Sequence, residues 1–442
     1  MIVVHVTHEA VEKIGGIGAV IAGLTTTEAY AEAVSRTILL GPLLTTGRPV
    51  NRRLGEGGHV IYSSLDAVCP PQWREKFLAI ERTYDVGIIY GTSKVTDACT
   101  GKTVEAEVLL VDVFHANNNR LNLFKAELFK KFAVPSRDFE QIWEYEEYVR
   151  LAEPGFEALK VIGAEAEQMV ILAHEYMGMP TALRAVLDGA ESTRTVFYAH
   201  EVASVRPIVE KLPGHDTMFY NVLAKAGQAG RSLEEVFPAV FGNYKHPLVK
   251  AARYCDHVFA VGDFVRAELR FIDRHFETMD IDLVYNGIPA ERITPSQRLA
   301  SKAKLQQYAE NLYGWRPTWA FTHVARPVLS KGIWRDLAVL HHLEEILAGR
   351  GETAVYFMLG TLAGQRRPQD IRQMERVYGW PANHEPGYPD LCQGEEVVGE
   401  MFKHFNGNHE AARAVFVNQW DWNRQACGER MPKEMGSVAR SW

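Results

Sequence analysis

Short apolar segments alternate with longer amphipathic segments along most of the chain. Parallel strands that are buried on both faces by crossover helices have continuous apolar runs, so this alternation predicts a doubly wound α/β fold. The predicted strands of the first part of the chain are residues 2–6, 86–90, 107–113, 169–173, 195–198, 257–261 and 282–285. Several of them are followed by helix-like stretches.

A turn at Asn286 and Gly287 ends this series of elements, and residues 290–307 are polar and contain no candidate strand. Polar stretches of this kind separate domains. We therefore predict a first domain over residues 1–288 and a second over 289–442. The second begins with a predicted βαβ unit made of a strand at 318–325, a loop at 326–332, a helix at 334–348 and a strand at 354–359.

The composition is that of a folded protein in an aqueous compartment. Of 442 residues, 47% are hydrophobic and 23% are charged. A formal charge of −7 gives no general basic field for a phosphate backbone, which argues against a dedicated nucleic-acid binder but leaves local binding of a nucleotide open. The first segment is too short and polar for a signal peptide, and no other segment suits a membrane span, so we expect a cytoplasmic protein. The oligomeric state stays open.

The sequence predicts no metal site. Its five cysteines are widely spread and never form a C-x-x-C pair, which favours reduced, structural thiols over a disulfide framework or a thiolate zinc site. His174 and His200 are each followed by glutamate, but Gly178 and Ser204 stand where a second histidine of H-E-x-x-H is needed. A zinc protease is therefore excluded.

A glycine-rich loop, Lys13-Ile14-Gly15-Gly16-Ile17-Gly18, follows the first predicted strand and leads into a helix-compatible segment. Glycines let backbone amides approach a ligand, a helix start presents unbonded N–H groups, and Lys13 adds a charge suited to phosphate. The spacing matches neither G-x-G-x-x-G nor a P-loop. Two interpretations are open: an anion-binding loop, or a turn that packs a helix onto the sheet.

Arg326 and Lys331 lie five residues apart in the predicted loop after the first strand of the second domain. An arginine fork and a lysine near a helix start can hold a diphosphate and stabilise it as a leaving group. Each residue alone is more often an exposed surface charge.

His200 follows the end of a predicted strand, and so does the sequence His174-Glu175-Tyr176. A histidine at the carboxyl edge of a sheet either contacts a ligand or is hydrogen-bonded within the core. Both interpretations remain open for the two histidines when each is taken alone.

In this order, the motifs resemble those of the glycogen and starch synthase group of retaining glycosyltransferases. The glycine-rich loop resembles the family's K-x-G-G-L-G, His174-Glu175-Tyr176 its H-D-W motif, and Arg326 with Lys331-Gly332 its G-R-L-x-x-x-K-G, with Tyr198-Ala199-His200 and Asn286-Gly287-Ile288 between them. The resemblance covers about residues 1–340. It implies the GT-B fold, in which two Rossmann-like domains face a cleft.

The resemblance also implies an activity. The family transfers glucose from ADP-glucose or UDP-glucose to the non-reducing end of an α-1,4-glucan, with retention and without a metal or other cofactor. The implied donor contacts are Lys13, Gly15, Gly16 and Gly18, the implied catalytic residues are His200, Arg326 and Lys331, and the implied acceptor-side residues are His174, Glu175 and Tyr176.

The sequence departs from the family in one segment. The donor-binding E-P-x-G-L-x-x-x-E is absent, because the two Glu-Pro pairs, at Glu153 and Glu385, are each followed by glycine and an aromatic residue. We therefore expect the second domain to be incomplete. Two alternatives stay open: another GT-B glycosyltransferase with a small-molecule acceptor, and an inactive protein that binds a nucleotide sugar or a glucan.

Overall fold

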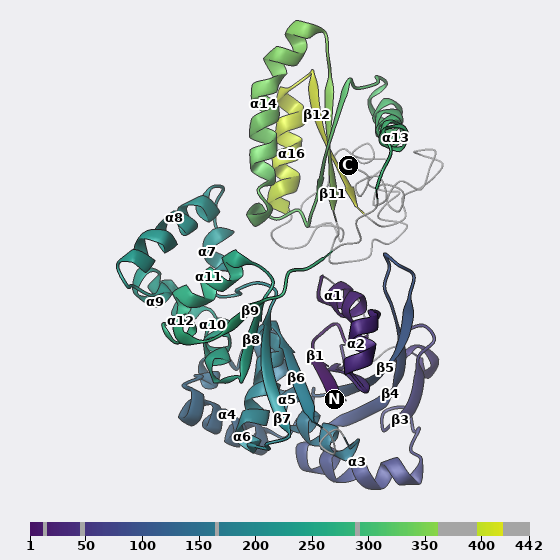
Figure 1. Cartoon of the computed structure of the whole chain (residues 1–442), viewed down its shortest axis with the longest axis vertical. Coiled ribbons are helices and arrows are strands. Elements are labelled where there is room, and N and C mark those ends of the chain that lie inside the picture. Colours follow the sequence, from purple (N-terminus) through teal and green to yellow (C-terminus); the bar gives the residue numbers. More distant parts are fainter. Residues whose placement is uncertain (12–15, 45–48, 164–167, 288–291, 361–395, 419–442) are drawn as a thin grey trace. The chain divides into compact units, whose positions relative to one another are not determined.

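The alternating segments form two α/β units, seen in a computed structural model of the chain (Figure 1). The structure describes residues 1–11, 16–44, 49–163, 168–287, 292–360 and 396–418. Unit 1 comprises Met1–Val205 and Asn221–Pro289, and unit 2 comprises Arg206–Tyr220 and Ala290–Trp442. The first domain predicted from the sequence includes Arg206–Tyr220, which belongs to unit 2.

Unit 1 contains a nine-stranded sheet with the strand order β3-β4-β5-β2-β1-β6-β7-β8-β9. The strands are β1 (Ile2–Val6), β2 (Arg36–Pro42), β3 (His59–Ser63), β4 (Gly87–Thr96), β5 (Thr103–Asp112), β6 (Met169–His174), β7 (Thr193–Ala199), β8 (His257–Ala260) and β9 (Ile281–Leu283). The helices in the same part of the chain are α1 (Gly16–Thr25), α2 (Glu28–Ala33), α3 (Pro71–Tyr84), α4 (Asn118–Phe132), α5 (Trp143–Val161), α6 (Glu175–Asp188), α7 (Arg206–Val209), α8 (His215–Gln228), α9 (Leu233–Val236), α10 (His246–Ala251), α11 (Asp263–Ile272) and α12 (His275–Thr278). Helix α7 and the first residues of α8 belong to unit 2.

The central strands of unit 1 are apolar on both faces, as the sequence predicted. Ile2 and Val4 of β1 pack in a core with residues of α3, α5 and α6, whereas Val3 packs on the opposite face, beside residues of α2. Successive side chains of a strand point to opposite faces, so one strand serves both cores. The sheet is therefore a buried layer between helices, and ligands reach it at its edges.

At one edge of this sheet the strands are antiparallel, where the sequence predicted parallel strands. Strands β3, β4 and β5 pair antiparallel, while the other neighbouring strands of the sheet pair in parallel. Only residues 97–102 connect β4 to β5. A connection this short makes a hairpin but cannot make the crossover that parallel neighbours require.

Unit 2 has a parallel sheet in the order β10-β11-β12, with helices on both faces. Its elements in the C-terminal part of the chain are α13 (Pro295–Tyr313), β10 (Trp319–Val324), α14 (Ile333–Arg350), β11 (Ala354–Gly360), α16 (Glu396–Asn408) and β12 (Ala412–Asn418). Helix α13 packs on one face, and α14 and α16 pack on the other, as Figure 1 shows. Each unit thus has the doubly wound organisation of a Rossmann-like domain. Among the described residues, every helix is too short or too polar to span a bilayer.

Candidate functional site

Three histidines line up at the carboxyl edge of the unit 1 sheet, from the neighbouring strands β1, β6 and β7. His5 lies in β1, His174 ends β6, and His200 directly follows β7. His5 Nδ1 lies 2.9 Å from His174 Nε2, and His174 Nδ1 lies 2.9 Å from His200 Nε2. The hydroxyl of Tyr30 lies 3.2 Å from His5 Nε2. We call His5, His174 and His200 the histidine chain.

Burial keeps the histidine chain neutral. Desolvation, aided by His200, lowers the pKa of His5 to about 3, and desolvation lowers the pKa of His200 to about 4. His174 is fully buried, and burial together with the adjacent imidazoles holds its pKa well below the ordinary value. A neutral imidazole has one donor and one acceptor nitrogen, so the rings can form hydrogen bonds in series. His200 therefore presents an uncharged ring at the sheet edge.

The low pKa of His200 predicts a dependence of stability on pH. In the unfolded chain this histidine takes up a proton near pH 6.5, but in the folded chain only near pH 4. Between these two pKa values the unfolded state binds more protons than the folded state, so the free energy of unfolding falls as the pH drops. The contribution of His200 to this fall is about 3 kcal/mol. We expect His200→Asn to lose this part of the dependence. Urea unfolding of both proteins at pH 7.5 and 4.5 measures it; equal changes in the two proteins would contradict it.

The residues expected on the acceptor side lie inside the protein. His174, Glu175 and Tyr176 are 0%, 4% and 5% exposed. Glu175 has a φ of +57°, which is uncommon outside glycine, and its carboxylate accepts the Glu201 N–H at 2.6 Å. The bond ties the chain after β6 to the chain after β7. These residues therefore support the structure of the sheet edge and offer little surface to a ligand.

A charged cluster surrounds Glu144 at the start of α5, and of its members only Tyr176 is singled out by a sequence motif. Tyr176 and Tyr244 donate their hydroxyls to the Glu144 carboxylate, and Lys245 Nζ lies 3.4 Å from it. Burial alone would raise the pKa of Glu144, but the bonds from the two tyrosines and Lys245 outweigh it and the net shift is downward. The side chains of Glu144 and Lys245 are 49% and 28% exposed. This Glu144 cluster (Glu144, Tyr176, Tyr244 and Lys245) thus offers a fixed charge pair to a ligand.

Glu147, one turn further along α5, has the opposite pKa shift. Burial, followed by repulsion from Glu144, raises the pKa of Glu147 to about 7. The folded state therefore holds a proton that the unfolded chain releases near pH 4.5, so the free energy of unfolding falls as the pH rises from 4.5 to 7, by about 3 kcal/mol. We expect Glu147→Gln to gain stability relative to the native protein over this range. Unfolding midpoints at pH 5 and 8 test this, and a constant difference between the two proteins would refute it.

The glycine-rich loop is described from Gly16 onward, and Lys13 and Gly15 lie outside the described residues. Gly16 is exposed at the start of α1, and a Cβ built on it meets no atom within 4 Å. The N–H of Gly18, which is buried, donates to Glu9 Oε2 at 2.9 Å. Carboxylates are favourable at helix N-termini. Glu9 therefore already accepts the hydrogen bond of the Gly18 amide, one of the groups expected to contact the donor. A donor contact at Gly18 requires Glu9 to move.

Arg326 and Lys331 follow β10 in unit 2, and both side chains are exposed. Residues Leu329–Lys331 form a single 3₁₀ turn, and Gly332 then adopts a φ of +74° before α14 begins. The two cations thus lie at the carboxyl end of a parallel strand and at the start of a helix. Both are places where α/β proteins bind anions.

The segment Arg206–Tyr220 braces this loop within unit 2. Ser330 donates its hydroxyl to Glu210 at 2.6 Å and accepts a hydrogen bond from Arg206 at 2.7 Å. Arg335, in the first turn of α14, binds both carboxylate oxygens of Asp216 at 2.8 Å. Bidentate pairs of this kind fix geometry as well as adding energy. The brace therefore holds the loop that carries Arg326 and Lys331.

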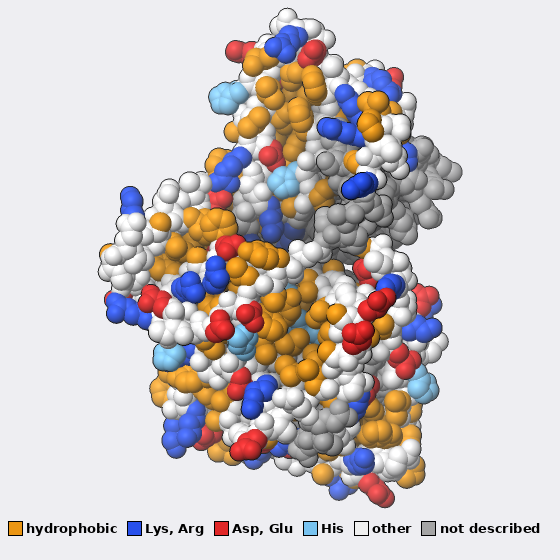
Figure 2. Space-filling model, in the orientation of Figure 1, with side chains coloured by type: hydrophobic (Ala, Val, Ile, Leu, Met, Phe, Trp, Pro, Cys, Tyr) orange, Lys and Arg blue, Asp and Glu red, His pale blue; other side chains and the backbone are white. Residues whose placement is uncertain are grey.

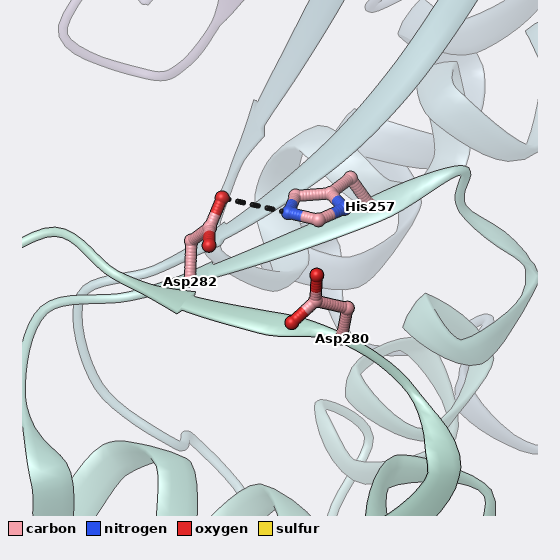
Figure 3. A group of neighbouring side chains, drawn as sticks. All are labelled: His257, Asp280 and Asp282. Carbon is pink, nitrogen blue, oxygen red and sulfur yellow. Dashed lines mark hydrogen bonds and ion pairs between the residues drawn. The ribbon is translucent and has the colours of Figure 1, made fainter.

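A group of possible metal ligands, His257, Asp280 and Asp282, lies at the amino ends of β8 and β9 (Figure 3). The parallel register places Val258 opposite Ile281, so the three side chains share one face. His257 Nε2 lies 2.9 Å from Asp282, and one ligand atom from each residue lies within 4.8 Å of the others. Imidazole and carboxylate together suit divalent transition metals. The histidine chain lies at the opposite end of the sheet, so the two groups are separate.

No family model and no curated protein matches the chain. Solved structures with a similar arrangement include trehalose-6-phosphate from E. coli bound with UDP-2-fluoro glucose, with a TM-score of 0.44 and 11% identity over 96% of this chain and 75% of that one. The α,α-trehalose-phosphate synthase (UDP-forming) from Burkholderia xenovorans, in complex with glucose-6-phosphate, has a TM-score of 0.40 and 12% identity over 96% of this chain and 75% of that one. The N-terminal domain of the Candida albicans trehalose-6-phosphate phosphatase has a TM-score of 0.43 and 12% identity over 94% of this chain and 71% of that one. Similarity at this level carries no conclusion about activity.

Proposed function

We propose that the chain is a glycosyltransferase of GT-B type that moves a hexosyl group from a nucleoside diphosphate sugar to an acceptor hydroxyl. One observation carries the proposal: motif residues far apart in the sequence lie at the ligand-binding edges of two doubly wound units. His174 and His200 lie at the edge of one sheet, and Arg326 and Lys331 lie at the end of β10 in the other unit. The reaction needs both a site for the sugar and a cationic site for the diphosphate.

The proposed roles follow from charge. As the C1–O bond to the diphosphate breaks and a bond to the acceptor oxygen forms, negative charge grows on the leaving diphosphate, which takes the acceptor proton. Arg326 and Lys331 stabilise that charge. His200 uses Nε2 toward His174, and its Nδ1 has no hydrogen-bond partner among the described residues, which suits contact with a sugar hydroxyl. The donor is UDP-glucose or ADP-glucose, and no step is assigned to a metal.

A small polar acceptor is our first candidate for the second substrate. The resemblance to glycogen and starch synthases favours a glucan, but His174, Glu175 and Tyr176 are too buried to form an exposed track for a polymer. The accessible polar groups near Tyr176 include Glu144 and Lys245, a compact pair of opposite charges. Such a pair can orient a small acceptor through two contacts, whereas a glucan end remains the second candidate.

Products formed from UDP-glucose or ADP-glucose distinguish these candidates. The full chain is incubated with each donor and with either free hexoses and hexose phosphates or glycogen, and the products are identified by mass spectrometry. We expect a glycosylated small molecule. Elongated glycogen would establish the second candidate, and donor binding without any product would indicate an inactive binding protein.

The Glu144 cluster gives a matched pair of variants for the acceptor assignment. We expect Glu144→Gln to raise the KM for the acceptor about tenfold, with the KM for the donor unchanged, because one charged hydrogen-bond acceptor is lost. Glu75→Gln, on the exposed side of α3, serves as the control. Equal effects of the two substitutions would remove the cluster from the acceptor site.

A further inference from the structure

Four arginines line a pocket on unit 1 whose lining contains none of the three residues of the histidine chain. The arginines are Arg231, Arg266, Arg270 and Arg274, and the pocket has a volume of about 280 Å³. We infer that this arginine pocket binds a small phosphate ester. The inference is independent of the proposed transferase activity, because it rests on residues that the activity does not use.

The scaffold places the arginines around one space. Arg266 and Arg270 are one turn apart on α11, so their side chains leave the same face of the helix. Arg274 follows the end of α11 and binds the Gly230 carbonyl across the pocket. Arg231, next to Gly230, donates to the Glu235 carbonyl at 2.8 Å. Both of these bonds go to backbone oxygens, and the Glu235 carboxylate also attracts the two arginines.

The acidic groups of the pocket do not balance its arginines. Asp263 pairs with Arg266 at 3.2 Å and also accepts the hydroxyl of Tyr285, and Glu277 is the other carboxylate in the lining. Four guanidinium groups therefore meet three carboxylates, the two in the lining and that of Glu235, which attracts Arg231 and Arg274. Arg270 is exposed and has no hydrogen-bond or ion-pair partner among the described residues. Its fork of donors is free to bind phosphate oxygens in a bidentate manner.

Size and surroundings limit the class of ligand. About 280 Å³ is just below the usual volume of ligand sites, which suits a sugar phosphate better than a dinucleotide. Leu223, Ala267 and Phe271 give the pocket apolar walls that can contact a carbon skeleton. The surrounding helices α8, α9, α11 and α12 carry acidic side chains among the basic ones (Figure 2), and these repel a long polyanion such as nucleic acid.

Calorimetric titration of the full chain with ribose 5-phosphate tests the inference, with ribose and sulfate as matched ligands. We expect ribose 5-phosphate to bind and ribose not to bind, with sulfate at least tenfold weaker, because only the ester offers both the anion and the carbon skeleton. Arg270→Gln should weaken binding at least tenfold, since it removes a charged bidentate contact. Arg82→Gln, on the exposed side of α3, should leave binding unchanged.

The variant Arg326→Ala shows whether the ester binds in the arginine pocket or in the proposed donor site. We expect this variant to retain binding of ribose 5-phosphate. Arg270 is exposed, so its replacement should leave the thermal unfolding midpoint unchanged, which confirms that the variant is folded. The inference is overturned if the native chain does not bind the ester at millimolar concentration, or if Arg270→Gln binds it as tightly. Equal affinity for sulfate, or loss of binding only in Arg326→Ala, would overturn it as well.

Discussion

We expect replacement of both Arg326 and Lys331 by alanine to lower kcat/KM for sugar transfer by about 10²-fold or more, because removing a single preorganised donor to a developing anion already has an effect of this order. The two side chains are exposed at the end of β10, and the bonds from Arg206–Tyr220 to Ser330 and Arg335 use side chains that the variant keeps. The loop should therefore keep its conformation in the variant. Steady-state rates with UDP-glucose and ADP-glucose measure the effect.

The matched control replaces Arg350 and Lys403, two exposed cations elsewhere in unit 2. It removes the same charge from the same unit, so any general electrostatic attraction of the donor is lost equally. Unchanged transfer by this control, together with loss in the Arg326 and Lys331 variant, locates the effect in the loop. Similar losses in both variants would argue against a diphosphate site after β10.

Gly178→Ala should lower the free energy of unfolding by about 3 kcal/mol or more, which is at the upper end of the range for overpacked sites. A Cβ at this position of α6 would lie 2.5 Å from the Cα and 2.8 Å from the carbonyl carbon of Ala173, in the adjacent strand β6. Both are backbone atoms, so no rotamer change relieves the contact. Helix and strand must separate, and His174 and Tyr176 lie in that connection.

Gly23→Ala in α1 is the matched control, because a Cβ there meets no atom within 4 Å. Alanine favours the helix over glycine, so this variant should be as stable as the native protein or up to about 1 kcal/mol more stable. Urea unfolding of the two variants measures the difference. If Gly178→Ala behaves like Gly23→Ala, then α6 does not pack on β6 as closely as described.

The strands that could be predicted are the ones buried on both faces. Strand β1 coincides with its predicted residues, and β6 and β8 differ from theirs by one residue, because continuous apolar runs are a strong signal. Strand β4 continues six residues beyond the predicted end at Tyr90, through Gly91–Thr96. That part pairs with β5 at the sheet edge and contains several polar residues, so it has no apolar run to predict it. Strand β2 ends in proline and was not predicted.

Local sequence predicts residues at strand ends but not the partners that come from elsewhere in the chain. His174, His200, Arg326 and Lys331 could be located because His174 ends a strand and the other three follow one. Glu144 meets Tyr176 across 32 positions and Tyr244 across 100, so no motif joins them. Ser330 meets Arg206 across 124 positions for the same reason. Glu9 had a usable signal, since it is a carboxylate just after β1, beside a glycine-rich helix start.

The most direct test of the proposed function is the release of nucleoside diphosphate by the full chain, compared with His200→Ala and with the Arg326 and Lys331 double variant. Donors and acceptors are those of the product assay. We predict that release by the native chain depends on both a donor and an acceptor, and that it falls in both variants while each remains folded. Release that is absent with every pair, or that is equal in all three proteins, would contradict a sugar transferase built on these residues.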